Sequence, residues 1–584
     1  MAKSDARFGY KADLKRSDHD LSQRFGLTAA PGMELPIWFD FASPGDSYYI
    51  SHDMPLLRSK NLAGPAMIDV KVHYETFFVP MQMIYQPFEN TFFSLSNLQS
   101  SNYFTPDLQN NNFPLFDFST FCSDLRLNHG HSDYTADAFR MCDLFGFNPQ
   151  CIIDGLKRSQ SAYTPSFFPW QILAYHTIYQ YYYRLDDKDS FANDFCNWDK
   201  YYNSTTPVTP IYRFMEIHQR PWDFDYFMSV YRSPIISAFN SQQTLPYGNY
   251  SDLVNIPTSG IQFGGQANSN NNAKDSFSNI VNTVNQNSVQ MAISTAGIRQ
   301  MFANEKLAMI TGRTKKNYDS QVLAHYGFSV PHDVKHDITM IHHDEFELKV
   351  LQVTDTANTT GSSLGELAGQ SYSTGNGKQF KFTAPCHGVM MTLLCVEPKK
   401  RYIGGFDRIN AITNSFDFPV PEFDRLGNQP MYRFECGYDE DQYSTFANTD
   451  IIGWKERYYA FKRKYDKCTH AFVTGSGLGS NNYSCYMLAD RPFATPDFHA
   501  GLTSAESQRP DLVQRFYIER NACDNLLFIP FLHGFSYPND GQSGEDWRVN
   551  PYLLYARDPF IINSFVKAKK VSWMSKDGEP IYNF

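Results

Sequence analysis

The feature that most constrains this fold is the way strand-like segments are distributed along the chain. In VKVHYETFFVP, residues 70–80, the side chains divide into two sets on a two-residue period, and Pro80 ends the run. Similar segments occupy residues 35–41 and 46–52, and the sequence between them, ASPGD, carries the turn residues Pro-Gly-Asp. The chain therefore opens with a group of three strands.

The other strand-like segments lie near the far end of the chain. They occupy residues 346–353, 379–385, 387–398, 525–532 and 560–571. Eight short strands separated by turns favour a β-sandwich. Because almost half of the chain separates the two groups, a single sandwich would carry very long loops, as viral jelly rolls do. Unless the two groups belong to unrelated domains, we therefore expect a mainly β chain in which residues 31–584 form one eight-stranded β-sandwich of the viral jelly-roll kind, with strands mainly in 31–85 and 340–571.

The middle of the chain, residues 86–339, has the pattern of large insertion loops that contain helices. One helix is expected near 169–185, with Pro169 in its first turn, and another near 289–312, with Gly312 as its C-terminal stop. Residues 234–287 are polar and close to low complexity, which is typical of a surface excursion. The centre of this segment includes Gly264, Gly265, Asn270, Asn271 and Asn272.

Charge limits the classes of partner. The chain of 584 residues has a formal net charge of -10, whereas a free-standing nucleic-acid-binding domain is usually basic. Contact with nucleic acid would therefore be local or assisted by a basic partner. The N-terminal segment 1–30 has five cations within its first 20 residues, which suggests a flexible basic arm, although a frayed terminus would look the same.

Two stretches mix cations with aromatic residues, the combination that binds single-stranded nucleic acid through phosphates and stacked bases. They are residues 453–467 and 565–576. The candidate DNA-facing residues are Lys455, Arg457, Lys462, Arg463, Lys464, Lys467, Lys567, Lys569, Lys570 and Trp573. A solvated charged face, or aromatic residues buried in a subunit contact, would give the same pattern.

Motifs for catalysis and cofactors are weak. GSSLG at 361–365 lacks the strand and helix of a nucleophile elbow, and STGNGKQF at 373–380 fails the P-loop pattern. In HDVKHDITMIHHDE, residues 332–345, imidazoles and carboxylates could together hold a divalent metal, or they could form a polar interface or loop. Pro331 and the strand pattern argue against a helix there. We therefore expect no enzyme, no cofactor and no committed metal site.

Compartment signals are also weak. The N-terminus has no apolar core of a signal peptide, and no run of 18 apolar residues is present, so we expect no membrane insertion. The ten cysteines are scattered without a C-x-x-C pair, which fits reduced thiols in a cytosol.

Several blocks, in order along nearly the whole chain, resemble the major capsid proteins of the Microviridae, the small icosahedral single-stranded DNA phages, and their gokushovirus-like branch. The blocks are HDLSQ (19–23), PGDSYYIS (44–51), VHYETFFVPMQMIY (72–85), YDSQVLAHYG (318–327), SLGELAGQ (363–370), PCHGVMMTLLCVEP (385–398), IGWKERYYAFKRKYDKCTHAF (452–472) and GEP (578–580).

The resemblance implies a shell subunit with a single jelly roll. It also implies that residues 234–287 form a surface protrusion, whose candidate receptor-binding residues are Gly264, Gly265, Asn270, Asn271 and Asn272. It implies a T=1 icosahedral shell of sixty copies that encloses circular single-stranded DNA and is assembled in a bacterial cytoplasm. The implied partners are further copies of the chain, the genome, a small basic DNA-binding protein, scaffolding and pilot proteins of the same phage, and a host-cell surface receptor. The aromatic content of 16% suits large subunit interfaces.

Two other functions remain open at this stage. A carbohydrate-binding or carbohydrate-active β-sandwich would explain the aromatic residues and carboxylates, but it would normally carry an export signal. A single-stranded DNA-binding protein outside any capsid would explain the two basic-aromatic stretches, but it conflicts with the acidic net charge.

Overall fold

The structure, a computed structural model, describes about half of the chain, in ranges separated by gaps. The described residues are 16–59, 69–88, 113–116, 133–147, 167–185, 211–231, 337–354, 367–403, 406–424, 427–436, 451–470, 488–490, 516–520, 522–523 and 558–574, with a few single positions between them. The candidate protrusion 234–287, the predicted strand 525–532 and the GSSLG segment all lie outside these residues, as do His332 and His336.

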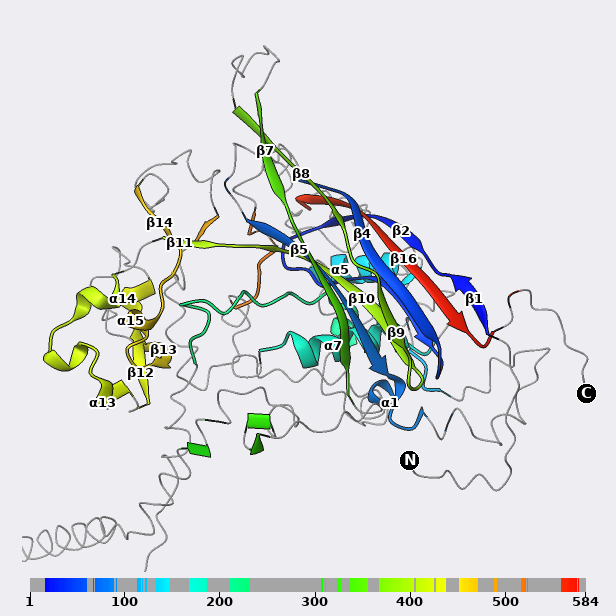
Figure 1. Cartoon of the computed structure of the whole chain (residues 1–584), viewed down its shortest axis with the longest axis horizontal. Coiled ribbons are helices and arrows are strands. Elements are labelled where there is room, and N and C mark those ends of the chain that lie inside the picture. The colour runs from blue at the N-terminus through cyan, green and yellow to red at the C-terminus, as the bar shows by residue number, and fades with distance from the viewer. Residues whose placement is uncertain are drawn as a thin grey trace, which may run out of the picture.

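Two antiparallel sheets form the body of the molecule (Figure 1). The larger sheet has seven strands: β1 (Ser17–Asp20), β2 (Gln23–Ala29), β4 (Ser47–Ser59), β7 (Lys349–Thr354), β8 (Leu367–Asn376), β9 (Phe380–Thr383) and β16 (Phe560–Ser572). The smaller sheet has four, in the order β3 (Leu35–Ala42), β10 (Gly388–Pro398), β5 (Val70–Pro80) and β6 (Thr339–Glu347). The predicted mainly β class is confirmed.

The period of two in the sequence determines how these sheets pack on one another. Alternate side chains of β5 and β4 meet between the sheets: Tyr74 stacks on His52 with ring centroids 5.6 Å apart, and the Thr76 hydroxyl lies 2.9 Å from Nε2 of the same histidine. Phe78 packs on Phe382 of β9 at 5.2 Å. The two sheets therefore share one aromatic core, as in a β-sandwich.

The turn between β3 and β4 forms as its residues predict. Gly45 has a φ of 87°, and the N–H of Asp46 donates to the Ser43 carbonyl at 3.0 Å. A proline followed by a glycine in the left-handed region gives a type II turn, which reverses the chain within four residues. The reversal carries the chain from the four-stranded sheet to the seven-stranded sheet.

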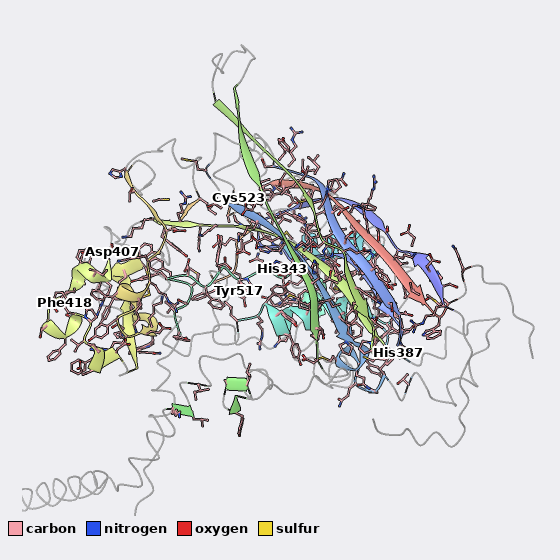
Figure 2. All side chains as sticks on the ribbon, viewed as in Figure 1. His343, His387, Asp407, Phe418, Tyr517 and Cys523 are labelled. Atoms are coloured by element: carbon pink, nitrogen blue, oxygen red, sulfur yellow. The ribbon has the colours of Figure 1, made fainter. Side chains whose placement is uncertain are left out.

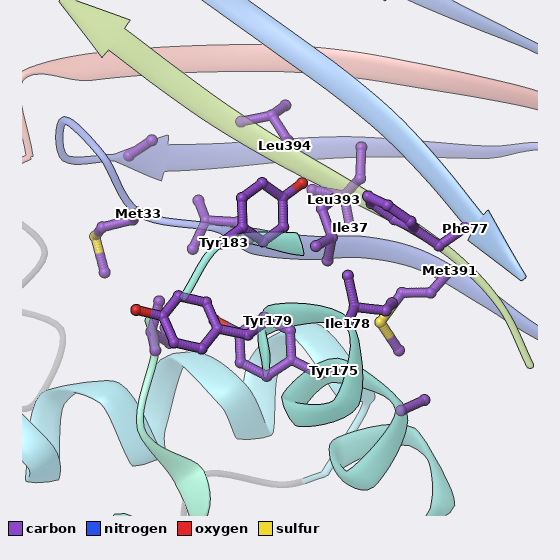
Figure 3. Packing of buried hydrophobic residues seen from close by; sticks show 14 of the residues in the cluster. Met33, Ile37, Phe77, Tyr175, Ile178, Tyr179, Tyr183, Met391, Leu393 and Leu394 are labelled. Carbon is purple, nitrogen blue, oxygen red and sulfur yellow. The ribbon is translucent and has the colours of Figure 1, made fainter. Parts of the chain in front are cut away.

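Helices cover the face of the four-stranded sheet that points away from the larger sheet (Figure 3). Helix α7 (Trp170–Tyr182) starts directly after Pro169, as predicted, and its residues from Ile172 to Tyr179 are all buried. It packs on β5 through Phe77 and Tyr182, whose ring centroids are 4.9 Å apart. A helix that is buried over two successive turns in this way is covered on every side. Helix α5 (Asp133–Phe145) lies beside it and was not predicted.

The remaining elements are short. They are α1 (Met81–Ile84), η2 (Ile211–Met215), β11 (Arg401–Ile403), η4 (Arg408–Ala411), η5 (Ser415–Asp417), α13 (Pro421–Asp424), β12 (Asn428–Tyr432), α14 (Arg433–Cys436), β13 (Ile451–Glu456), α15 (Tyr459–Lys462), β14 (Lys467–Cys468) and β15 (Ala489–Asp490). The elements from η4 to α15 gather in a cluster beside the sheets (Figure 1, left), which we call the lateral cluster, residues 406–465.

The N-terminal segment differs from the expectation. A flexible arm reaching residue 30 is wrong for its second half, because residues 17–20 and 23–29 form β1 and β2 and pair with β16 at the end of the chain. In QRFGLTA, apolar residues at 25, 27 and 29 alternate with other residues at 24, 26 and 28, and this alternation was the sequence signal for β2. Residues 1–15 lie outside the described residues. Of the helix expected at 289–312, only residues 306, 307 and 310 are described, and they are helical.

Candidate nucleic-acid interface

The two basic-aromatic stretches lie in different parts of the molecule. Residues 453–465 belong to the lateral cluster, Lys467 follows it at the start of β14, and residues 565–572 belong to β16 in the seven-stranded sheet. Figure 2 shows the separation, with Asp407 and Phe418 marking the lateral cluster and His343 marking the sandwich. The two stretches have similar compositions, but in the structure their side chains have different surroundings.

In the lateral cluster, Lys455 is a buried structural residue. Its side chain is 3% exposed, its Nζ donates to the carbonyl of Tyr226, and the ammonium lies 4.6 Å from the ring centroid of the same tyrosine. Burial lowers the pKa of Lys455 to about 8. A buried lysine held in this way is unavailable to a phosphate, so Lys455 leaves the set of DNA-facing candidates.

The other cations of 453–467 are mostly engaged within the cluster. Lys462 pairs with Asp424, Lys467 pairs with Asp407, and Arg463 lies 3.5 Å from Glu456. Arg457 is half-buried, with its guanidinium 5.1 Å from the ring centroid of Tyr458. Lys464 is exposed. Ion pairs on a surface exchange readily with other partners, but they lower the local excess of positive charge.

Strand β16 gives a different arrangement because its side chains alternate between core and solvent. Val566, Ala568 and Lys570 point into the sandwich and are buried. Phe565, Lys567 and Lys569 point outward. Lys570 therefore also leaves the candidate set. Its Nζ lies 2.9 Å from Asp40 of β3 and 3.3 Å from Asp46, so this lysine joins the two sheets.

The outward side of β16 is part of a wider surface that we call the open sheet face. It consists of the outward side chains of Arg24, Tyr49, Lys381, Phe565, Lys567 and Lys569, from strands β2, β4, β9 and β16. Antiparallel register brings them together, because Phe565 lies opposite Arg24, and Tyr49 lies opposite both Lys569 and Lys381. Cross-strand neighbours are close enough for such side chains to touch.

Cations lie over aromatic rings across this face. Arg24 lies 4.8 Å from the ring centroid of Phe565, and Lys381 lies 5.4 Å from that of Tyr49. Such contacts hold the cation close to a flat apolar surface. At the edge of the sheet, Arg16 lies 4.2 Å from the ring of Trp573, which is 39% exposed. A face of this composition offers rings for base stacking beside groups that neutralise phosphates.

Carboxylates balance part of the charge on the open sheet face. Lys567 pairs with Asp53, and Lys569 lies 3.0 Å from Asp18. Both lysine side chains are more than half exposed, so each can turn to an outside partner. Within the part of the chain that the structure describes, Arg24 and Lys381 have no carboxylate partner, and these two carry the least compensated positive charge.

Sequence reasoning missed Arg24, Tyr49 and Lys381. Each stands in a different segment. Lys381 has Lys378, Phe380 and Phe382 close by in the sequence, but Arg24 and Tyr49 belong to no run that mixes several cations with aromatic residues. The local signal that all three share is the period-two alternation that places them outward on their strands. Which strands are neighbours in the sheet is decided by the tertiary structure. The candidate receptor residues Gly264, Gly265, Asn270, Asn271 and Asn272 lie outside the described residues.

Comparison with known proteins connects this architecture with one family. Residues 10–121 and 168–528 match the family described as "Capsid protein (F protein)". The match covers most of the chain and includes strands of both sheets. The chain belongs to this capsid protein family. Its resemblance to the major capsid proteins of the Microviridae, with a gokushovirus-like character, is thereby confirmed.

One curated relative supports the assignment. The chain is 26% identical over 175 residues to "Capsid protein VP1" of Chlamydia phage 1, a match that covers 28% of this chain and 29% of that protein. The capsid family fixes a structural role and a place in the virion. Among the described residues, no helix of this capsid protein is long and apolar enough to cross a membrane.

Proposed function

We propose that this capsid protein forms a T=1 icosahedral shell of sixty copies around a circular single-stranded DNA genome. Membership of the capsid family supports the structural role. Identical subunits enclose a volume by assembling with closed symmetry. The shell is assembled in the cytoplasm of a host bacterium. Scaffolding and pilot proteins of the same phage and a host surface receptor are the further partners of this proposal.

The subunit fold that fits this role is the eight-stranded jelly roll. The support is the strand order: β2, β16, β4 and the β8–β9 pair lie side by side in one sheet, and β3, β10, β5 and β6 lie side by side in the other. Apart from the step from β5 to β6, the chain crosses from one sheet to the other between successive members of this set. Two sheets that interleave in this way form the double Greek key of a jelly roll.

The helices then belong to the long connections between the strands. α1, α5, α7 and η2 all fall between β5 and β6, in residues 81–338. The lateral cluster falls between β10 and β16. In this proposal both connections are jelly-roll loops enlarged for contacts between subunits, and the protrusion at 234–287 lies in the first of them.

The open sheet face is the surface that we assign to the genome. The observation that carries this assignment is the set of cation–ring pairs in register across four strands, with Arg24 over Phe565 and Lys381 over Tyr49. An acidic chain cannot neutralise a genome alone, so a small basic DNA-binding protein supplies the remaining charge. Lys567, Lys569 and Trp573 remain candidates for DNA contact in this proposal.

Electron microscopy of particles tests the shell. The protein, produced together with the neighbouring phage genes, should give uniform icosahedral particles whose reconstruction contains sixty copies in a T=1 arrangement. The open sheet face should border the density of the genome. Soluble monomers under every condition of co-expression would overturn the shell. Particles whose open sheet face points to the exterior would overturn only the DNA assignment.

A pair of matched variants tests the DNA surface in a second way. Arg24→Gln with Lys381→Gln removes two cations from the open sheet face. Lys462→Gln with Lys467→Gln removes two cations that pair with carboxylates of the lateral cluster. The first pair should lower the DNA content of purified particles and reduce the salt dependence of single-strand binding, by about 0.7 in slope for each lost phosphate contact. Equal DNA content in both pairs would contradict the assignment.

A further inference from the structure

Three side chains that can bind metals come together at the edge of the four-stranded sheet. His73 and Glu75 are two residues apart on β5, so they share one face of the strand. His343 of β6 stands directly opposite Glu75 in the antiparallel register, which places it on the same face. Backbone pairing alone therefore holds the three ligating groups as neighbours.

The same register divides the HHDE sequence between two faces. His342 and Asp344 point between the sheets, where Asp344 Oδ2 lies 2.9 Å from His52 Nδ1 and Oδ1 lies 3.1 Å from His342 Nε2. His343 points to the other face. A metal held by consecutive residues of this segment is therefore excluded by the strand geometry, and the partners of His343 come from β5.

The distances suit a small divalent ion. His73 Nδ1 lies 3.0 Å from His343 Nε2, and His343 Nε2 lies 3.8 Å from Glu75 Oε1. All three ligand atoms lie within 4.8 Å of one another. Tetrahedral zinc with bonds near 2.0 Å places its ligand atoms about 3.3 Å apart. The observed spacings lie on both sides of that value, so small rotations of the side chains would complete the site.

The charge around the three residues is negative. Arg220 is the nearby guanidinium, and it faces three carboxylates: Glu75 at 2.8 Å, Glu34 at 3.2 Å and Glu397 at 3.4 Å. Burial raises the pKa of Glu34 to about 8, so this group is mostly neutral at pH 7. Glu75 and Glu397 still outnumber the single arginine, and a bound cation would balance the remainder.

Neighbouring groups already orient the ligands. Glu75 receives hydrogen bonds from Arg220 and from the hydroxyl of Tyr183. His73 is buried, and its second nitrogen, Nε2, lies 2.9 Å from Glu397 Oε2 but makes no hydrogen bond in the present ring orientation. A slight turn of the ring would let Nε2–H donate to Glu397 while Nδ1 ligates a metal, the carboxylate–histidine–metal arrangement common in zinc sites.

The site is accessible from one side. The side chain of His343 is 38% exposed, whereas those of His73 and Glu75 are buried. A metal can therefore reach the three ligands from solvent and can keep one coordination position for water. We propose that His73, Glu75 and His343 form a binding site for a divalent transition metal, with Zn²⁺ as the best match, that links β5 to β6. Imidazole and carboxylate together suit Zn²⁺ better than Ca²⁺ or Mg²⁺, which favour all-oxygen sites.

Cobalt substitution tests the site directly. The purified full-length protein is treated with a chelator, dialysed and titrated with Co²⁺, whose visible absorption becomes intense when its ligands are tetrahedral. One equivalent of Co²⁺ per chain should give these bands, and Zn²⁺ should abolish them by competition. Added Zn²⁺ should also raise the Tm of the chelated protein. Absence of tetrahedral bands would overturn the proposal.

Variants distinguish this site from adventitious binding. His343→Ala removes an exposed ligand with little risk to folding and should abolish the cobalt bands. His19→Ala changes a part-exposed histidine in β1 of the other sheet; it is the matched control and should leave them unchanged. Glu397→Gln keeps the shape of the side chain but weakens the acceptor for His73, and should reduce affinity about 10- to 100-fold. Bands that persist in His343→Ala, or disappear in His19→Ala, would contradict the assignment.

Discussion

Lys570 of β16 donates a hydrogen bond to Asp40 of β3 at 2.9 Å and thereby joins the two sheets of the sandwich. The lysine is also 3.3 Å from Asp46, whose side chain is buried. Lys569, the preceding residue, points the other way and forms an exposed pair with Asp18. Consecutive lysines of one basic stretch thus have opposite roles, and the alternation of the strand decides which is which.

This contrast predicts unequal effects on stability. Lys570→Ala leaves two carboxylates near the core without their cation, and we expect it to lower the free energy of unfolding by about 3 kcal/mol. Lys569→Ala removes only a surface pair and should cost less than about 1 kcal/mol. Urea denaturation of the purified subunit measures both. Equal losses would show that the buried pair is not the main connection between these sheets.

A buried pair of histidines predicts sensitivity to acid. His176 Nδ1 lies 2.8 Å from His218 Nε2 beneath the stacked ring of Tyr179, and burial lowers the pKa of His176 to about 4 and that of His218 well below its usual value. Both groups are neutral in the folded protein but titrate near 6.5 when unfolded. Their contribution to stability is therefore complete above pH 6.5 and is lost as the pH falls toward 4.

The loss can be isolated by comparison with a variant. For His176 alone we expect about 1.5 kcal/mol less stability at pH 5 than at pH 6.5. His176→Asn should be less stable at neutral pH but should show a shallower dependence over the same range. The comparison is needed because burial raises the pKa values of the buried carboxyls Asp137 and Glu216. These two groups make the folded state more stable as the pH falls, which is opposite to the effect of the histidines. If the wild type and His176→Asn lost stability equally between pH 6.5 and pH 5, the histidine pair would not be the cause of the acid sensitivity.

Two glycines predict opposite results for the same substitution. Gly32 has a φ of 73°, and a Cβ there would lie 2.4 Å from Cβ of Ile518. Gly32→Ala should therefore destabilise the protein by more than about 2 kcal/mol, through strain and a clash with a neighbouring segment. Gly26 of β2 has open space around it, and Gly26→Ala should be neutral or stabilising by up to about 1 kcal/mol. Thermal unfolding of the two variants measures the difference. Equal Tm values would contradict the predicted clash between a Cβ at position 32 and Ile518.

The lateral cluster gives a prediction about genome packaging. Lys462 and Arg463 pair with carboxylates of the same cluster, whereas Lys464 is exposed. Replacing all three by Ala should leave the DNA content of particles unchanged, since the open sheet face is the proposed site of contact. If particles of this triple variant lost their genome, the DNA interface would have to include the lateral cluster and the assignment to the open sheet face would be wrong.

Much of the sandwich could be predicted because a strand has a recognisable pattern in its local sequence. The residues of β3, β5, β10 and β16 follow a clear period of two or a continuous apolar run, and turn residues stand between them. Helix α7 was recognisable from Pro169 and the apolar residues after it. Helix α5 was missed, although helical spacing was available in its sequence. Strand β2 was hidden by the assumption that a terminal basic segment is flexible.

The basic-aromatic stretches show why surface function was harder to predict. Composition correctly identified cations beside rings, but it could not separate Lys569, which is exposed, from Lys570, which is buried. It could not bring Arg24 and Lys381 to the same face either, because these residues lie in strands that are distant in sequence. Only pairing with β16 and β4 makes them neighbours.

The sequence by itself determined the strand-rich class, the turn at Gly45 and the capsid family, since each depends on local pattern or on the order of blocks along the chain. The tertiary structure decided which strands are neighbours and which face each side chain occupies. It alone placed His343 beside His73 and Glu75, more than 260 residues away in the chain. The physical reason is that hydrogen bonding between strands depends on backbone groups that every residue carries, so local sequence specifies a strand but not its partner.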